Sequence, residues 1–176
     1  IGTSPRLTAK DGDGSSLVDA GLDQSVKDGR AALDALAGWL RARYAGSRVL
    51  GVGHRVVHGG AKYAAPCVVT PEVLADLRAL IPLAPLHQPN NLAPIRSIRG
   101  RFPQMPQVAC FDTAFHRSHD PVADHFAIPE SLYAEGVRRY GFHGLSYEYI
   151  AGRLTELFPD VAKGRVIVAH LGSGAS

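Results

Sequence analysis

The sequence has little of what marks specialised protein classes. It holds only 2 cysteines among 176 residues, and no apolar run approaches the ~18 residues that a membrane helix needs. Cys67 and Cys110 are too few for a disulfide framework or a cysteine-rich zinc cluster. The sequence also starts at Ile1 without a basic and then apolar signal segment. The low cysteine content makes a reducing, cytoplasmic location the default expectation, and the lack of long apolar runs argues against association with a membrane.

A strong excess of charge of one sign is also missing. The 19 basic and 16 acidic residues give a formal net charge of +3, and the basic residues are scattered. This pattern argues against a nucleic-acid surface and only weakly favours small anionic ligands. The hydrophobic fraction of 45% is typical of a globular chain long enough for one domain, or for one domain and part of another.

The two ends of the sequence are unusual for a natural domain. It begins without methionine, and it stops at Ser176 in a glycine-rich stretch that follows an apolar run. A strand that turns into a loop at the end of a chain would lack a partner. We therefore expect these residues to be a fragment of a longer protein.

Apolar periodicity predicts an α/β domain in which strands alternate with helices. Residues 1–22 read as irregular chain or a short hairpin, and residues 113–145 as a long irregular segment of the kind that is usually functional. Prolines between 82 and 89 predict an extended loop. The expected helices and strands are helices at 23–43, 71–80 (capped by Thr70), 92–100 and 146–158 (capped by Ser146), and strands at 49–57, 67–69, 107–111 and 165–170.

Polar side chains stand where the expected strands end, and further polar segments lie in loops. Ligands of open α/β sheets gather at strand ends, because loops there converge on one crevice. We therefore expect a shared site. Its candidate residues are His54, Arg55, His58, Asp112 and His170 at strand ends, together with the loop segments 85–91 and 139–147.

Ordinary structural explanations exist for several of these residues. The spacing of His54 and His58 fits two metal ligands on a helix, but their surroundings are β-like, which disfavours metal binding. A buried Arg55 needs either a structural acid or an anionic ligand. The remaining histidine cluster is better explained by a solvated loop than by a metal site, and comprises His116, His119 and His125.

Five segments of the sequence resemble the ordered motifs of the acetate kinase family, a branch of the sugar-kinase, Hsp70 and actin superfamily. They are GHRVVHGG, PLHQPNN, FDTAFH, YGFHG and HLGSGAS, and they occur in the family's order at similar intervals. The resemblance covers Val49 to Ser176 well and Ile1 to Arg48 only faintly. It implies an incomplete ribonuclease-H-like (actin-like ATPase) α/β domain with a mixed sheet flanked by helices.

The resemblance also implies how the chain is divided. Residues 1–48 would be a partial N-terminal region, and residues 49–164 the acyl-substrate and catalytic domain. Residues 165–176 would be the truncated start of a C-terminal nucleotide-binding domain. The sequence as given would then be an N-terminal-half fragment that does not turn over ATP on its own.

Matched residues receive roles from the same resemblance. Arg55 would contact the carboxylate or the transferred phosphoryl group, and His143 would stabilise that group in flight. His87 and Asp112 would lie at the catalytic centre, and no residue of the fragment would bind a metal directly. The four residues Arg55, His87, Asp112 and His143 would converge on one cleft, with reactive atoms roughly within 10–12 Å of each other. Two further sets are implied, namely an acyl pocket of Val57, Leu86 and Phe142 and a nucleotide phosphate loop of His170, Gly172, Ser173 and Gly174.

The sequence departs from the family pattern at three places. Residues 88–91 read Gln-Pro-Asn-Asn where the family usually has Asn-Pro-Ala-Asn, and Ser173 replaces an asparagine. Residues 145–147 read Leu-Ser-Tyr where the family usually has Thr-Ser-His. The family's Gly-Ser-rich phosphate loop, its second catalytic arginine and its metal-proximal glutamate have no match in these residues.

The implied reaction is the reversible transfer of the ATP γ-phosphoryl group to acetate by in-line displacement, with Mg²⁺ or Mn²⁺. Acetate is ionised at neutral pH and needs no general base, so Asp112 is better suited to order a metal-bound water or to orient Arg55. Phosphoryl transfer needs positioning and charge compensation, which Arg, His and a glycine loop supply. The implied ligands are acetate, ATP, ADP and acetyl phosphate, and the full-length protein would be a homodimer.

Several other functions stay open. A propionate or butyrate kinase of the same family differs by a methylene or two, and one methylene changes binding by only ~1–3 kcal/mol. A non-catalytic nucleotide- or partner-binding member of the superfamily is a second alternative, and a histidine-rich metal hydrolase is a third. A P-loop kinase is disfavoured because no lysine-bearing P-loop is present.

Overall fold

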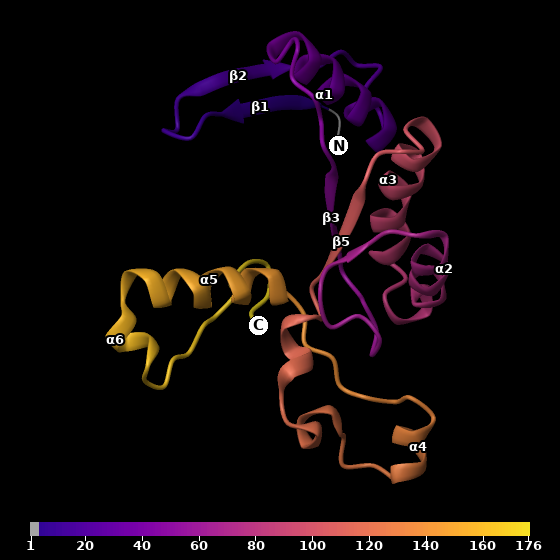
Figure 1. Ribbon diagram of the computed structural model, residues 1–176, viewed down its shortest axis with the longest axis vertical. Coiled ribbons are helices and arrows are strands. Elements are labelled where there is room, and N and C mark those ends of the chain that lie inside the picture. The colour runs from indigo at the N-terminus through magenta and orange to yellow at the C-terminus, as the bar shows by residue number, and fades with distance from the viewer. Residues whose placement is uncertain (1–3) are drawn as a thin grey trace. The chain divides into compact units, whose positions relative to one another are not determined.

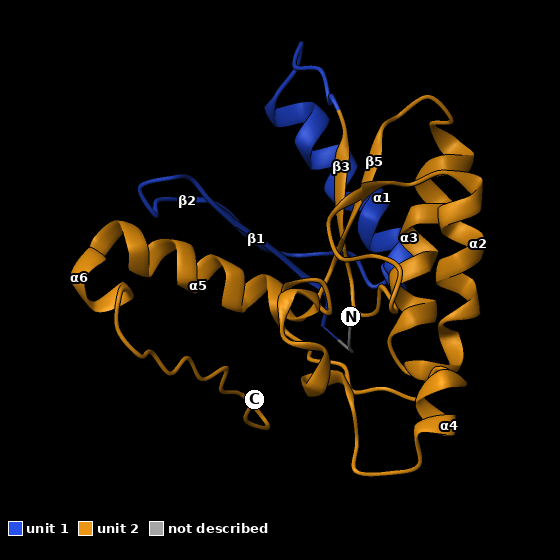
Figure 2. Cartoon of the chain, turned by 60° about the horizontal axis from the view of Figure 1, so that its bottom comes forward, with its two compact units in different colours: residues 1–50 blue, residues 51–176 orange. Residues whose placement is uncertain are grey.

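The computed structural model describes residues 4–176, so residues 1–3 of the expected N-terminal segment lie outside the described part. The chain divides into two compact units, residues 1–50 and residues 51–176 (Figure 2). All of the residues expected to form the site belong to the second unit.

The first unit begins with a hairpin. Strand β1 (Arg6–Lys10) pairs antiparallel with β2 (Ser16–Gly21), and Asp11 accepts a hydrogen bond from the Ser15 amide in the turn between them. Of the two structures predicted for residues 1–22, irregular chain or a short hairpin, the hairpin is therefore the correct one.

Helix α1 (Gly29–Arg43) follows the hairpin, and it starts six residues later than periodicity predicts. Asp23 accepts a hydrogen bond from the Ser25 amide in a local turn, and Asp28 caps the helix by accepting from the Ala31 amide at 2.8 Å. Such local side-chain bonds offer the backbone an alternative to the helix. The expected helix over 23–43 is therefore wrong in its first turn and a half.

The second unit is built on a three-stranded mixed sheet in the order β3-β5-β4. Strands β3 (Val52–Val56) and β5 (Gln107–Phe111) are parallel, and β4 (Cys67–Val68) is antiparallel to β5. Strand β3 starts at residue 52 rather than 49, because its first ladder bond runs from the Val52 amide to the Pro106 carbonyl. The strands expected at 49–57 and 67–69 are present with shorter ends, and the strand expected at 107–111 is present with the expected bounds.

Two helices lie side by side next to this sheet, α2 (Pro71–Ala79) and α3 (Gln88–Arg101) (Figure 1). Thr70 caps α2 as expected, accepting from the Val73 amide. The apolar core between helices and sheet consists of Val56, Val69, Leu77, Leu92, Ile95, Ala109 and Phe111.

The expected extended loop over residues 82–89 is wrong. Pro82 lies in a short 3-10 helix, Ile81–Leu83, and Pro89 lies in the first turn of α3. Proline is tolerated in the first turn because the amide hydrogen it lacks would have no partner there. Helix α3 therefore starts four residues before the expected position 92.

The segment expected to be irregular, residues 113–145, contains short helices. They are the 3-10 helices Phe115–Ser118 and Pro121–Asp124 and helix α4 (Glu130–Ala134). Helix α5 (Gly144–Leu157) starts at Gly144, and Ser146 does not cap it as expected. The His143 carbonyl accepts from the amides of Ser146 and Tyr147, so the first turn has already formed at Ser146.

After α5 and α6 (Pro159–Ala162) the chain runs extended. The prediction of a strand at 165–170 is wrong, because these residues form no strand. A strand needs a neighbour that supplies its ladder hydrogen bonds. Within residues 4–176, only the His170 end of this segment has backbone pairing, to Ser176, and Ile167 is 97% exposed. None of the helices described is both long enough and apolar enough to cross a bilayer.

Candidate active site

An ion pair between Arg55 and Asp112 stands at the ends of the two parallel strands. Arg55 is opposite Cys110 in the β3–β5 ladder, and Asp112 is the first residue after β5. Arg55 Nε lies 3.0 Å from Asp112 Oδ1 and 3.1 Å from Oδ2, and Arg55 Nη2 lies 2.8 Å from Oδ2. The Asp112 side chain is only 2% exposed, whereas that of Arg55 is 64% exposed. The buried carboxylate therefore holds a guanidinium that extends into solvent.

This ion pair leaves part of the guanidinium available for another anion. The hydrogen bond from Arg55 to Asp112 raises the pKa of Arg55, so the guanidinium is charged at every physiological pH. Asp112 takes the Nε donor and one donor of Nη2. An arginine carries five N–H donors, so both donors of Nη1 and the second of Nη2 can bind a further oxyanion.

His143 is placed next to this pair through the backbone of Asp112. The Gly144 amide donates to the Asp112 carbonyl at 2.8 Å, and a Cβ on residue 144 would lie 2.4 Å from that carbonyl oxygen. Glycine is therefore needed at position 144. His143 itself has a left-handed backbone, with φ of 58°, and its Nδ1 is buried without a hydrogen-bond partner. Such strain and an unpaired polar atom are typical of functional positions.

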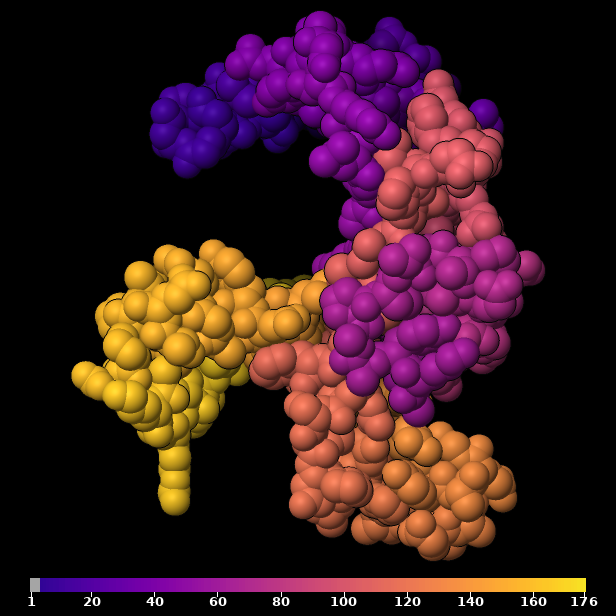
Figure 3. Space-filling view, in the orientation of Figure 1, coloured from indigo at the N-terminus to yellow at the C-terminus, as the bar shows by residue number. Residues whose placement is uncertain are grey.

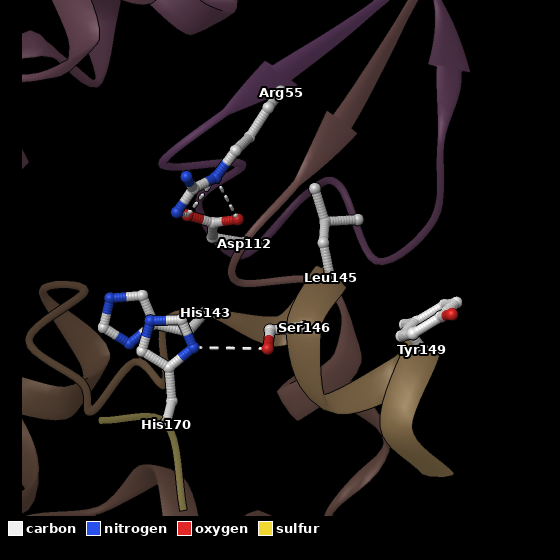
Figure 4. A pocket seen from close by; sticks show the side chains of 7 residues that line it. All are labelled: Arg55, Asp112, His143, Leu145, Ser146, Tyr149 and His170. Atoms are coloured by element: carbon white, nitrogen blue, oxygen red, sulfur yellow. Dashed lines mark hydrogen bonds and ion pairs between the residues drawn. The ribbon is translucent and has the colours of Figure 1, made fainter. Parts of the chain in front are cut away.

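His170 completes a cavity on one side of the ion pair. Its ring stacks on the His143 ring with centroids 4.2 Å apart, and its Nδ1 lies 3.2 Å from Ser146 Oγ (Figure 4). The cavity measures about 320 Å³ and is lined by Arg55, Asp112, His143, Leu145, Ser146, Tyr149 and His170.

A second cavity, of about 530 Å³, lies against the same residues. Arg55, Asp112 and His143 line both cavities, and His87 lines only this one. The four residues expected to converge therefore do face one space. Its full lining is Arg55, Val57, Leu83, Ala84, His87, Asn91, Asp112, Phe142 and His143.

Not every expected residue lies in these cavities. Leu86 was expected in the acyl pocket, but it is 78% exposed and lines neither cavity, whereas Leu83 and Ala84 line the larger cavity. The reason is local: the end of the 3-10 helix at Leu83 and the following Ala84 face the cavity, and Leu86, further along the connection to α3, points to solvent. The three residues Gly172, Ser173 and Gly174 form an exposed turn outside both cavities, closed by the bridge between Leu171 and Ala175.

Sequence reasoning missed three polar or aromatic lining residues. Asn91 belongs to the PLHQPNN segment, and a start of α3 at Gln88 would have placed it one turn from His87. Ser146 and Tyr149 would have been found by extending α5 back to Gly144. The predicted starts of α3 and α5 were each too late by a few residues, and for this reason these residues were not singled out as part of the site.

The other histidines mostly have structural partners. His54 Nε2 lies 2.8 Å from Gln107 Oε1, and His58 Nδ1 accepts from the Gly60 amide. Burial lowers the pKa of His58, which keeps it neutral between β3 and the rings of Tyr140 and Phe142. Within residues 4–176, no three His, Cys, Asp or Glu side chains gather into a set that could hold a metal ion.

A buried carboxylate organises the segment between Asp112 and His143. The Asp124 side chain is 6% exposed and meets Arg117 at 2.9 Å, His119 at 3.2 Å and Arg138 at 4.0 Å. Burial acts to raise the pKa of Asp124, but the hydrogen bond from Arg117 and the nearby positive charges outweigh it and lower that pKa. Atoms of this part of the chain gather in one lobe (Figure 3).

The chain is similar to known proteins in sequence and in fold. The chain matches the model of the acetokinase family over residues 18–176. It is 58% identical to the acetate kinase of Nitrobacter hamburgensis and 56% identical to that of Rhizobium meliloti, over 100% of this chain but only 44% and 45% of those proteins. The chain thus spans less than half the length of these relatives.

Solved structures of acetate and propionate kinases have a similar fold. The crystal structure of Porphyromonas gingivalis acetate kinase matches with a TM-score of 0.75 at 36% identity, over 97% of this chain and 44% of that one. A propionate kinase from Francisella tularensis matches with a TM-score of 0.79 at 33% identity, over 92% of this chain and 41% of that one.

Fold and site together define an α/β domain of the actin-like ATPase class, with a cleft at the strand ends that is lined by Arg55, Asp112 and His143. The chain belongs to the acetokinase family. The expected ribonuclease-H-like fold, with a mixed sheet flanked by helices and only part of the domain present, is confirmed.

Replacing Asp124 by Asn should lower the free energy of unfolding by ~3 kcal/mol at pH 7, because it leaves partly buried cations without their counter-charge. The pKa of Asp124 is lowered in the fold, so the stabilisation is present above the ordinary aspartate pKa of about 3.9 and lost as pH falls through the folded-state value. Urea unfolding at pH 7 and at lower pH measures both effects.

The matched control is Asp120→Asn, an exposed residue that caps the following 3-10 helix through the Val122 amide. Asparagine caps as well as aspartate, so this variant should unfold like the parent. Equal stability of the two variants at pH 7 would show that the Asp124 cluster does not stabilise the fold.

Proposed function

We propose that the protein carrying this sequence is an acetate kinase, which transfers the γ-phosphoryl group of ATP reversibly to acetate. The observation that carries the proposal is the Arg55–Asp112 pair beside His143, in the wall shared by two cavities. Acetate kinases at 50–58% identity across the whole chain support it.

The chemistry of the shared wall supports this reaction. The transferred phosphoryl group is strongly anionic, and catalysis consists mainly of positioning and charge compensation. In the proposal, the free N–H groups of Arg55 bind the phosphoryl or carboxylate oxygens, and His143 donates to the group in transfer. Asp112 orients Arg55 rather than acting as a base, because both of its oxygens already accept from Arg55.

The larger cavity suits a short acyl chain. Its lining combines the apolar residues Val57, Leu83, Ala84 and Phe142 with the polar residues Arg55, His87 and His143. In the proposal a methyl group lies against these apolar residues. Propionate kinase stays a second candidate, since one solved neighbour carries that name and one methylene changes binding only modestly.

The smaller cavity, with His170 in its wall, is proposed to face the nucleotide phosphates. A magnesium or manganese ion would arrive with the nucleotide and lower the charge on its phosphates. Asp112 fits such an ion only through water, because Arg55 occupies its carboxylate. A cytoplasmic location and a homodimer of the full-length protein belong to the same proposal, and the free thiols of Cys67 and Cys110 agree with a reducing compartment.

The activity is tested on the full-length protein with ATP, acetate and Mg²⁺ by ³¹P NMR. We expect acetyl phosphate and ADP to appear in equal amounts. Unchanged ATP would instead indicate a non-catalytic binding protein, and inorganic phosphate without acetyl phosphate would indicate a hydrolase. Either result would contradict the proposal.

Arg55→Ala should lower kcat by about 10²–10³-fold, the usual cost of removing one transition-state donor. Val57→Ala should instead raise KM for acetate and improve the relative use of propionate, because it enlarges the apolar part of the cavity. Steady-state kinetics with both acids measure the two effects. Equal losses of kcat in the two variants would refute these roles.

A further inference from the structure

Asn91 is a polar residue of the larger cavity to which no role has yet been given. It lies in the first turn of α3, where its amide donates to the His87 carbonyl at 3.0 Å. It is half-buried, and it lines the cavity together with Arg55, His87 and His143.

The orientation of the Asn91 side chain is fixed by Val57. The Val57 amide donates to Asn91 Oδ1 at 2.9 Å. A backbone amide can only donate, so the oxygen of the Asn91 carboxamide must face Val57 and its NH₂ group must point elsewhere. No acceptor in the described part of the chain forms a hydrogen bond with Asn91 Nδ2. A donor with two hydrogens is therefore left at the cavity wall.

The rest of the wall shows what this donor can bind. Arg55 contributes free N–H groups, and the carboxylate of Asp112 is already occupied by Arg55. Arg55 and Asn91 thus offer donors at the cavity wall, and Val57, the residue whose amide holds Asn91, belongs to the apolar part of the lining. This arrangement is complementary to a small molecule with a carboxylate at one end and an alkyl group at the other.

We propose that Asn91 Nδ2 donates a hydrogen bond to the carboxylate of the acceptor acid, to the oxygen that does not attack phosphorus. The inference rests on the proposed function and deepens it, because it names the residue that fixes the acid in the orientation needed for attack. One carboxylate oxygen forms the new bond to the γ-phosphorus of ATP while the bond from that phosphorus to the bridging oxygen of the β-phosphate breaks and ADP leaves. The other carboxylate oxygen keeps its contact with Asn91 before and after transfer.

If Asn91 had a purely structural role, the substitution Asn91→Asp would have a different effect. Asn91→Asp preserves the shape of the side chain, and the new carboxylate can still accept from the Val57 amide. A residue that only anchors Val57 would tolerate this change. A residue that binds the acid would not, because the donor is replaced by a negative charge that repels the substrate.

The test is steady-state kinetics of the full-length protein carrying Asn91→Asp, with Asn90→Asp as matched control. Asn90 is the preceding residue, is exposed, donates to the Leu86 carbonyl and lies outside the cavity. We expect Asn91→Asp to raise KM for acetate by about 10–100-fold, the usual range for losing a hydrogen bond to a charged group. KM for ATP should stay within about twofold of the parent value, as should all constants of Asn90→Asp.

A second measurement needs no folded variant. In the parent protein, the side-chain ¹⁵N–H₂ resonance of Asn91 should shift on titration with acetate, whereas that of Asn90 should not. A KM for acetate unchanged by Asn91→Asp, or an Asn91 resonance that ignores acetate, would overturn the inference while leaving the kinase activity intact. A parent protein that forms no acetyl phosphate would overturn the proposed function itself.

Discussion

The ion pair between Arg55 and Asp112 is the interaction on which the whole site depends. The Asp112 carboxylate is almost completely buried, and a buried charge without a partner is costly. Its side chain therefore fixes Arg55, while its backbone carbonyl accepts from Gly144 and so fixes the start of α5 and the position of His143. One residue at the end of β5 thus joins two sequence-distant groups into the single wall that both cavities share.

This arrangement explains why the sequence was informative about the site and less so about its surroundings. Arg55 and Asp112 follow apolar strands, and parallel strands bring such ends together, so their convergence could be predicted. The start of α5 could not, since it depends on a left-handed His143 and on a backbone bond to Asp112 that no local pattern encodes. The resemblance placed Leu86 in the acyl pocket, and only the local path of the chain shows that Leu83 and Ala84, rather than Leu86, line the larger cavity.

Segment 165–170 was expected to be a strand, but it does not form one in the structure. Its apolar, β-branched residues are typical of a buried strand, but a strand exists only with a hydrogen-bonding neighbour. In the described residues that neighbour is missing and the segment stays extended and exposed. The hydrophobic pattern therefore predicts only that a segment favours the β conformation. Whether the segment forms a strand depends on a neighbouring strand to which it can hydrogen-bond.

The central claim is that Asp112 acts by holding Arg55, and a double-mutant cycle on the full-length protein tests it most directly. The values of kcat for the parent, Arg55→Ala, Asp112→Asn and the combined variant would be compared, with thermal unfolding as the control for folding. If Asp112 works through Arg55, the combined variant should be no slower than Arg55→Ala alone. If instead Asp112→Asn lowers kcat by the same factor with and without Arg55, Asp112 has an independent catalytic role and the account is wrong.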